Sequence, residues 1–420
     1  MRAALANPVY RRLYLAQILA LLGSGLATVA LGLLAYDLAG AGATRVLGTA
    51  LAVKMVAYVT LAPVMEALVA RLPRKRVLIG ADLVRMAVAA CLPLVTEAWQ
   101  IYPLIFVLQA ASATFTPLFQ SVLPDVLPGE DAYTGALSLS RLAQDMEAIL
   151  SPMLAAALLL AVSTGALFDG TAVGFAASAA LVASCAIPGR RAAAAGEGRD
   201  GGRGPAAFAR RARRGMALLA GRPALRPILA LNMVPAAGGG YVIVQTVVIA
   251  QSRLGLGEQA VAWLLAAAGA GSMAGALLLP AVLRRAPERA VMLSGAVLVT
   301  AATALIGPAL ALTGAAAVAA VAVLWAAIGV GWSAAETPVG RILRRHAPAA
   351  DLPAAFAAQF SLSHACWLVS YLVVGWVGAV SAPVAAAVMA VLAGAGALAA
   401  AALWRVAGEP AAAPATPRDA

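Results

Sequence analysis

Apolar segments long enough to cross a lipid bilayer recur along this chain of 420 residues. A bilayer core of about 30 Å needs roughly 20 apolar residues per helix. Turn residues and charges divide the chain into twelve such runs, with approximate limits 13–38, 46–70, 77–97, 98–123, 134–162, 165–188, 224–251, 258–283, 289–312, 314–340, 353–379 and 382–405. The sequence therefore predicts an all-α membrane protein with twelve transmembrane helices.

The composition excludes an ordinary soluble domain. Hydrophobic residues make up 63% of the chain and charged residues only 11%, whereas soluble domains use about 45 to 50% apolar residues. The formal net charge of +12 would indicate a nucleic-acid partner in a soluble protein. The positions of the basic residues decide what this charge means.

The basic residues gather on one side of the predicted membrane helices. With the N-terminus inside, 25 of the 30 Lys and Arg residues fall in cytoplasmic segments, and only Arg45 and Arg253 fall in outer loops. Cytoplasmic loops of membrane proteins carry such an excess. We therefore expect both termini in the cytoplasm, and no nucleic-acid partner.

One long polar interruption divides the twelve runs into two sets of six. It is rich in Gly and Arg and contains a basic stretch near Phe208 to Leu219, which we expect to form a short helix that could rest on anionic lipid. We predict an N-terminal six-helix bundle at 1–188, a cytoplasmic linker at 189–223, a C-terminal six-helix bundle at 224–408 and a disordered tail at 409–420.

The two halves resemble each other, as expected for a transporter built from repeats. The stretch "QILALLGSG" (17–25) aligns with "NMVPAAGGG" (232–240). Two further matches have nearly the same spacing along the chain: 71–81 aligns with 285–295, and Thr116-Pro117 aligns with Thr337-Pro338. Three matches at equivalent places predict a parallel 6+6 duplication.

Twelve runs, a 6+6 repeat, a basic central loop and a basic loop after the second run resemble the major facilitator superfamily of secondary transporters. In that family the loop after the second helix is a conformational latch. The run "PVMEALVARLPRKR" (63–76) contains the basic residues of this latch but has Ala70 where the family has an acidic residue. Glu66, one helical turn earlier, could take the place of that acidic residue. By resemblance, the latch residues are Glu66, Arg71, Arg74, Lys75 and Arg76.

The segments "YRRLYLAQILALLGSGLATVALGLLAYDLAG" and "PDVLPGEDAYTGALSLSRLAQDMEAILSP" are similar to a bacterial exporter branch that includes siderophore exporters and nickel-resistance permeases. The resemblance implies efflux of a small molecule by alternating access, by a monomer in the bacterial inner membrane. The carboxylates Asp145, Glu147 and Glu336 inside the predicted helices favour coupling to the proton gradient. A transition-metal exporter, and a non-cycling receptor or assembly protein, remain alternatives. No nucleophile–base set or nucleotide loop indicates an enzyme, and no cofactor is expected.

Ionisable side chains inside membrane helices are costly, so each is a candidate functional residue. The candidates for proton coupling or substrate binding are Asp37, Lys54, Arg141, Asp145, Glu147, Glu336 and His364. Two histidines and no cysteine pair give no visible metal site. The pair Asp82 and Arg85 is expected to be structural.

Several of these candidates have two interpretations that the sequence leaves open. Lys54 is either paired with Asp37 or free in the cavity to bind an anionic group, and Glu66 is either a latch contact to Arg71 or to a basic residue at 341–345, or functional. His364 could titrate near physiological pH or be a structural core histidine. Because the repeat aligns Lys54 with Gly269, its charge is specific to the first half.

The run Gly238-Gly239-Gly240 after Pro235 also permits two structures. One is a loosened helix that lines a cavity, and the other is close packing of helices through small residues.

Overall fold

The computed structural model describes residues 2–69, 72–127, 157–187, 205–348 and 351–406. Between 127 and 157 it also describes isolated positions, at 129, 132, 133, 136, 139, 140, 143, 147, 151 and 153–155. The described part of the chain contains helices and turns and no strand.

The first half consists of long helices joined by short turns. In chain order these are α1 (Arg2–Ala6), α2 (Pro8–Ala39), η1 (Gly40–Gly42), α3 (Ala43–Val69), α4 (Arg74–Cys91), η2 (Leu92–Leu94), α5 (Ala98–Val126) and α7 (Thr164–Ser184). Asn7 caps α2 by accepting hydrogen bonds from the backbone amides of Val9 and Tyr10. Gly40 ends α2 with a φ of +51°, a conformation that glycine adopts without strain.

The second half repeats this pattern after the linker. Its elements are α8 (Pro205–Gly221), α9 (Arg226–Leu231), α10 (Met233–Val248), the π-helical turn η4 (Ile249–Arg253), α11 (Glu258–Val282), α12 (Glu288–Ala304), α13 (Ile306–Leu310), α14 (Gly314–Glu336), α15 (Val339–His346), α16 (Leu352–Val380) and α17 (Ala382–Val406). The helices begin and end within a few residues of the apolar runs in the sequence.

Nine segments of the described chain are long and apolar enough to cross a membrane. The first of them, Pro8–Tyr58, contains the turn at Gly40–Gly42 and therefore covers parts of two predicted membrane helices. α5 is a further helix of 29 residues, and most of the predicted run 134–162 lies outside the described residues. The helices fit the predicted twelve-helix architecture.

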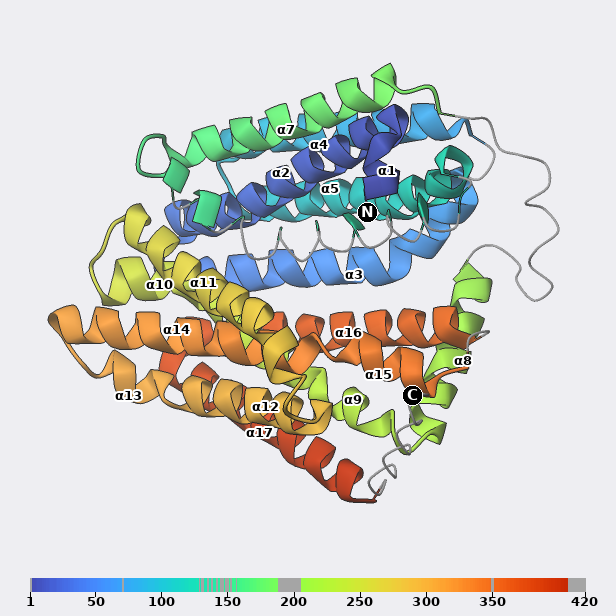
Figure 1. Cartoon of the computed structure of the whole chain (residues 1–420). Coiled ribbons are helices and arrows are strands. Elements are labelled where there is room, and N and C mark those ends of the chain that lie inside the picture. Colours follow the sequence, from blue (N-terminus) through green and yellow to red (C-terminus); the bar gives the residue numbers. More distant parts are fainter. Residues whose placement is uncertain are drawn as a thin grey trace.

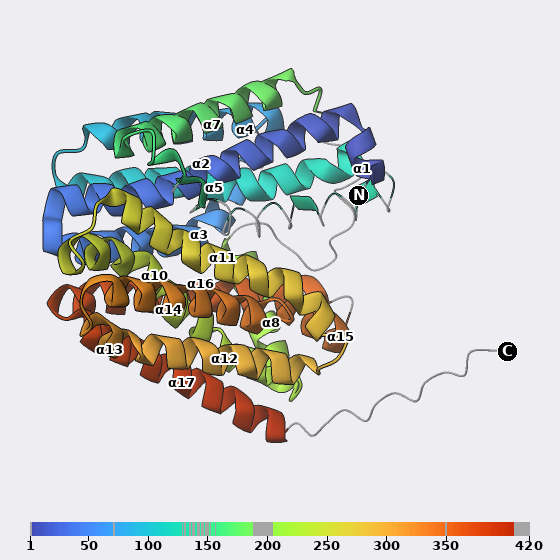
Figure 2. The same ribbon diagram turned by 60° about the vertical axis from the view of Figure 1, so that its left-hand side comes forward.

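The helices form two bundles that lie side by side (Figures 1 and 2). One bundle contains α2, α3, α4, α5 and α7, and the other contains α10 to α17. We call the end of the molecule that carries α1, α8 and α15 the terminal end. We call the opposite end, which carries the turn Gly40–Gly42, the far end.

Hydrogen bonds between the two bundles occur only at the far end, within the described part of the chain. The hydroxyls of Tyr36 and Ser252 are 2.8 Å apart, and Thr164 Oγ1 donates to Glu258 Oε2 at 2.8 Å. Nearby, α3 crosses α16 so closely that a Cβ atom on Gly48 would lie 2.7 Å from the Cα of Gly375. The bundles are therefore closed against each other at the far end.

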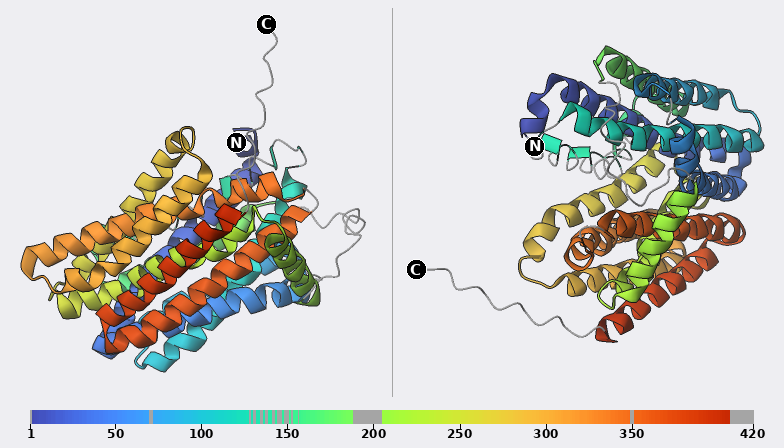
Figure 3. Two further views of the ribbon diagram at one scale, coloured as in Figure 1. Left: turned by 90° about the horizontal axis from the view of Figure 1, so that it is seen from below. Right: turned by 90° about the vertical axis from the view of Figure 1, so that its right-hand side faces the viewer.

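α8 crosses the terminal end roughly perpendicular to the long helices (Figure 3, right). It packs mainly on α16, where a Cβ atom on Gly215 would overlap the carbonyl oxygen of Ala354. Arg214 forms an ion pair with Asp351 at 2.7 Å. The basic helix expected near Phe208 to Leu219 is thus present, but one of its faces lies on protein, which the lipid-contact hypothesis did not anticipate.

Candidate functional site

Charged and aromatic side chains from both bundles meet near the middle of the membrane helices. Lys54 is the twelfth of 27 residues in α3, and His364 is the thirteenth of 29 in α16. Glu147 lies within electrostatic range of Lys54 and of Tyr58, and Lys54 also lies within range of His364. The rings of Tyr58 and His364 are 5.8 Å apart. We call Lys54, Tyr58, Glu147 and His364 the central cluster.

This arrangement argues against one of the two interpretations of Lys54, the pairing with Asp37. Asp37 is exposed at the far end of α2, where its electrostatic neighbour is Glu258. The expected ion pair between Lys54 and Asp37 does not form; the charged neighbour of Lys54 is Glu147. Glu147 and Lys54 thus lie within electrostatic range of each other in the first bundle, whose helix α3 packs against α16.

A glycine lets Glu147 approach α2. A Cβ atom on Gly25 would overlap Ser151 Oγ and lie 3.2 Å from Glu147 Oε1. The repeat partner of Gly25 is Gly240, whose Cβ atom would lie 3.0 Å from the Cβ of Ser370. The same close approach between helices therefore occurs once in each half, with a serine on the partner helix.

Buried amides repeat the same relationship. Gln17 Oε1 accepts a hydrogen bond from Ser140 at 3.0 Å, and its repeat partner Asn232 exchanges two hydrogen bonds, of 2.7 and 3.1 Å, with Gln359. These contacts set one register between the fifth run and α16, in which Ser140 aligns with Gln359. The same register aligns the serines at 151 and 370.

This register shows which charges have no counterpart in the second half. It aligns Arg141, Asp145 and Glu147 with Phe360, His364 and Cys366. Arg141 and Asp145 lie outside the described residues. The ionisable set of the first half is therefore replaced in α16 by an aromatic residue, a histidine and a thiol.

Aromatic rings form the second-bundle side of the site. Trp332 of α14 and Trp367 of α16 have ring centroids 5.1 Å apart, and Tyr371 lies 5.4 Å from Trp367. On the same helix the ring centroids of Phe360 and His364 are 3.8 Å apart. We call Trp332, Phe360, Trp367 and Tyr371 the aromatic wall.

The glycine run in α10 supports this wall by close packing. A Cβ atom on Gly239 would lie 2.6 Å from Trp367 Cη2 and 3.0 Å from Trp332 Cζ3. α10 runs without interruption through all three glycines, and the helix is interrupted at Asn232 instead. Close packing is therefore correct for this run, and the hypothesis of a loosened helix is wrong.

Glu336 lies next to the aromatic wall at the last residue of α14. Trp332 Nε1 donates a hydrogen bond to Glu336 Oε2. α14 ends at Glu336, and a turn at Thr337-Pro338 separates it from α15. In the first half, α5 continues through the repeat partner Thr116-Pro117. Glu336 thus belongs to the second bundle, toward the terminal end from the central cluster.

Asp82 and Arg85 form the expected structural ion pair inside the first bundle. Asp82 also accepts a hydrogen bond from Ser178 at 2.8 Å. The Arg85 guanidinium lies between the rings of Phe115 and Phe175, at 4.3 and 4.5 Å. This pair is almost fully buried and ties α4 to α5 and α7.

The described latch residues Arg74, Lys75 and Arg76 begin α4, at the terminal end and apart from the central cluster. Arg74 forms an ion pair with Asp125 of α5 at 2.5 Å. Lys75 and Arg76 form no ion pair with a described residue. Arg71 and the side chain of Glu66 lie outside the described residues.

Two of the three basic residues at 341–345 pair with an acid other than Glu66. Arg341 and Arg345 bind Glu288 at 3.2 and 3.0 Å.

Nothing in the described part of the chain gathers three His, Cys, Asp or Glu side chains that could hold a metal ion.

Sequence reasoning missed the aromatic partners of the charged residues. Tyr58 lies one helical turn after Lys54, and Phe360 lies one turn before His364, so each pair shares one helix face. Trp332 precedes Glu336 by the same spacing. Aromatic residues one turn from an intramembrane ionisable residue could therefore have been singled out.

Comparison with known proteins identifies the family. The model of the Major Facilitator Superfamily matches residues 13–335. This chain belongs to the Major Facilitator Superfamily. It is therefore a transporter of small molecules in a lipid bilayer, and not an enzyme.

Relatives of known function resemble this superfamily member only distantly. Macrolide efflux protein A of Streptococcus pyogenes is 30% identical over 122 residues, which are 28% of this chain and 30% of that protein. The matched stretch is thus less than a third of the relative.

Solved structures share the fold. A mutant of the nucleoside transporter NupG superposes with a TM-score of 0.73 at 13% identity, covering 94% of this chain and all of that one. A D-xylose-proton symporter gives 0.65 at 12% identity, over 95% and 97% of the two chains. A bacterial metal transporter gives 0.63 at 12% identity, over 94% and 98%.

Proposed function

We propose that this superfamily member is a proton-coupled exporter of a small molecule, with Glu147 as the proton carrier. The observation that supports the proposal is that Glu147 lies within electrostatic range of Lys54 in the first bundle, whose helix α3 packs against α16 of the second. Two ionisable side chains at this depth in a membrane helix bundle are energetically costly, and such residues usually have a function. No equivalent pair occurs at the aligned positions of the second half.

Protonation of Glu147 changes the charge balance of the central cluster. When the carboxylate is ionised, it holds the Lys54 ammonium by Coulomb attraction in a medium of low dielectric constant. When the carboxylate takes up a proton, this attraction is lost and the positive charge of Lys54 is no longer compensated by Glu147. Binding of substrate and binding of the proton are therefore linked through the same two side chains.

Alternating access follows from the contacts between the bundles. In this structure the hydrogen bonds between them lie at the far end, so the central cluster would be reached from the terminal end. The excess of Arg at the terminal end supports a cytoplasmic location for it. Glu147 would take up a proton when the far end is open and release it to the cytoplasm when the far end is closed.

The direction of transport is proposed from the partial similarity to Macrolide efflux protein A. A metal exporter has less support, because the likeness to the bacterial metal transporter is one of fold and the described residues bring no three His, Cys, Asp or Glu side chains together. A flux measurement distinguishes a non-cycling receptor from both kinds of exporter, because such a receptor would transport nothing.

The test is transport by the purified protein in liposomes with an imposed pH gradient. A panel of macrolides, nucleosides, siderophores and divalent metal ions is offered to the wild type and to Glu147→Gln. We expect flux of at least one compound that depends on the gradient and is lost in Glu147→Gln. The matched control is Asp169→Asn, which removes an exposed carboxylate of α7 and should transport like the wild type.

The proposal fails if the wild type shows no gradient-dependent flux across the panel. It also fails if Glu147→Gln transports the compound as fast as the wild type, with the same dependence on the gradient. Flux of metal ions alone would establish the metal exporter instead.

A further inference from the structure

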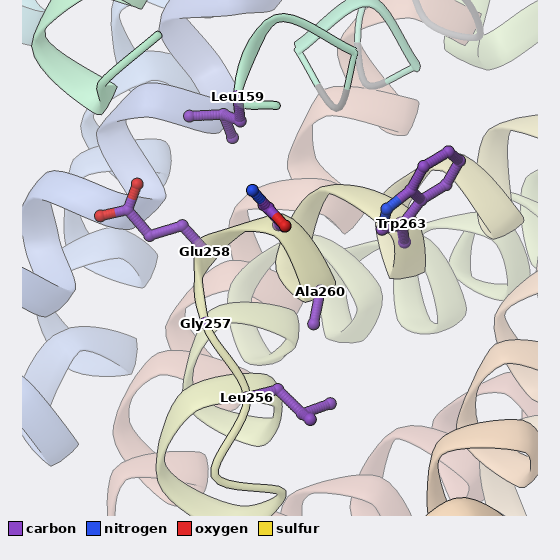
Figure 4. A pocket seen from close by; sticks show the side chains of 7 residues that line it. Leu159, Leu256, Gly257, Glu258, Ala260 and Trp263 are labelled. Carbon is purple, nitrogen blue, oxygen red and sulfur yellow. The ribbon is translucent and has the colours of Figure 1, made fainter. Parts of the chain in front are cut away.

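A pocket at the far end lies between the two bundles (Figure 4), and none of its lining residues belongs to the central cluster. Its volume is about 500 Å³, within the usual range for pockets that take small molecules. Its lining residues are Leu159, Leu256, Gly257, Glu258, Gln259, Ala260 and Trp263. Leu159 comes from the first half of the chain and the other six come from the second half.

The pocket combines a carboxylate with an apolar surface. Figure 4 shows the side chains of Glu258 and Trp263 on opposite sides of it. Trp263 is 59% exposed, so other described residues leave much of its large apolar ring uncovered. Leu159, Leu256 and Ala260 add further apolar contact. A ligand that fills this pocket therefore needs an apolar body and a group that suits a carboxylate.

The electrostatics of the pocket favour a cation. Glu258 Oε2 accepts a hydrogen bond from Thr164 at 2.8 Å, which fixes its position. Asp37 of α2 lies within electrostatic range of Glu258. Neither carboxylate forms an ion pair with a described basic residue. The partial positive charge at the N-terminus of α11 offsets part of the charge of Glu258. The two carboxylates together therefore keep a net negative charge.

We propose that this pocket is a second binding site, which takes an amphipathic organic cation. The positive group would lie at Glu258, and the apolar body would lie against Leu159 and the indole of Trp263, where a cation also gains from the ring quadrupole. The ligand would contact both bundles at the end where they are closed. Its binding therefore stabilises the closed far end and opposes the conformational change needed for transport.

The pocket can be tested by binding alone, without knowledge of the transported substrate. The full-length protein in detergent is titrated with tetraphenylphosphonium by calorimetry, and separately with tetraphenylborate, which has the same shape and the opposite charge. Empty micelles give the blank for each ion. We expect saturable binding of the phosphonium at one site and none of the borate.

Three variants locate the binding. Glu258→Gln should weaken it about tenfold, as expected for loss of one charge-assisted contact, and Trp263→Ala should weaken it by a similar factor. Glu147→Gln should change it by less than about twofold, because Glu147 belongs to the central cluster. This last result separates the pocket from the transport site, so the proposed function can fail while the pocket stands.

Binding that is equal in the wild type and Glu258→Gln overturns the proposal, as does equal binding of the two ions or loss of binding in Glu147→Gln. If Glu258→Gln does not fold, Asp37→Asn replaces it. Asp37 is exposed, and we expect its removal to weaken binding about threefold. Unchanged binding in Asp37→Asn would then contradict the proposal.

Discussion

Arg74 and Asp125 join the start of α4 to the end of α5 by an ion pair of 2.5 Å. The second half contains the same connection with the charges exchanged. In the alignment of 71–81 with 285–295, Arg74 corresponds to Glu288. Glu288 begins α12 and binds Arg345, which lies in the last turn of α15. The duplication thus kept the position of the pair and not its polarity.

Exchanging Arg74 and Asp125 should therefore be tolerated. Arg74→Asp and Asp125→Arg each place two like charges together and should lower the melting temperature of the purified protein. The double variant restores an attractive pair, and we expect a coupling free energy of about 1 kcal/mol. Arg76→Asp, which reverses an exposed charge without an ion pair among the described residues, is the matched control. No recovery in the double variant would contradict this account.

The Asp82–Arg85 pair should matter for stability. Asp82→Ala leaves the buried Arg85 charge without its carboxylate, which typically costs about 3 to 5 kcal/mol. Replacing both residues with leucine removes the uncompensated charge and should recover most of that loss. Thermal unfolding of the detergent-solubilised protein measures both. A melting temperature of Asp82→Ala equal to that of exposed Asp169→Ala would show that the pair contributes little.

The crossing of α3 and α16 should control closure of the far end. A side chain at Gly48 would meet the carbonyl oxygen of Tyr371 at 2.6 Å and the Cα of Gly375 at 2.7 Å. Gly48→Leu should therefore hold the far end open. In this structure the hydroxyls of Tyr36 and Ser252 are 2.8 Å apart. Cysteines introduced at these two positions can therefore be joined by a short bifunctional maleimide when the far end is closed, and the yield of this cross-link should decrease in Gly48→Leu.

Gly80→Leu is the control for that experiment, because a Cβ atom there has nothing within 4 Å. It should leave the yield of the 36–252 cross-link unchanged. Equal yields in Gly48→Leu and in the wild type would show that the two bundles close without this crossing.

The aromatic wall should determine how well substrate binds. Gly239→Ala would push against Trp332 and Trp367 and displace both rings. We expect the KM for a transported compound to rise while kcat changes less, since the proposed proton carrier, Glu147, is not part of the aromatic wall. Gly340→Ala, where a Cβ atom has nothing within 4 Å, is the control. An unchanged KM in Gly239→Ala would exclude the wall from substrate binding.

Much of the fold could be predicted because each membrane helix must contain its own hydrogen bonds and its own apolar length. The run predicted at 258–283 is α11 at Glu258–Val282, and the run at 353–379 is α16 at Leu352–Val380. The repeat also paired Gln17 with Asn232, and both residues make the same kind of bond between helices.

The site was less predictable, because contacts between helices depend on rotation and crossing angle. Lys54 could be identified as an unusual charge, but its charged neighbour could not. The alternative that pairs Lys54 with Asp37 is wrong. The partner Glu147 lies three membrane runs further along the chain, and no helix periodicity connects them. The glycine run illustrates the same limit, since only the positions of Trp332 and Trp367 decide between a loosened and a packed helix.

The central claim is that Glu147 carries the proton that drives export. It is tested most directly by measuring proton movement with a pH-sensitive dye trapped in liposomes, on addition of a compound that the wild type transports. We predict that the compound causes proton movement in the opposite direction to its own in the wild type, and none in Glu147→Gln, even if Glu147→Gln still binds the compound. Proton movement of equal size in Glu147→Gln would contradict the account.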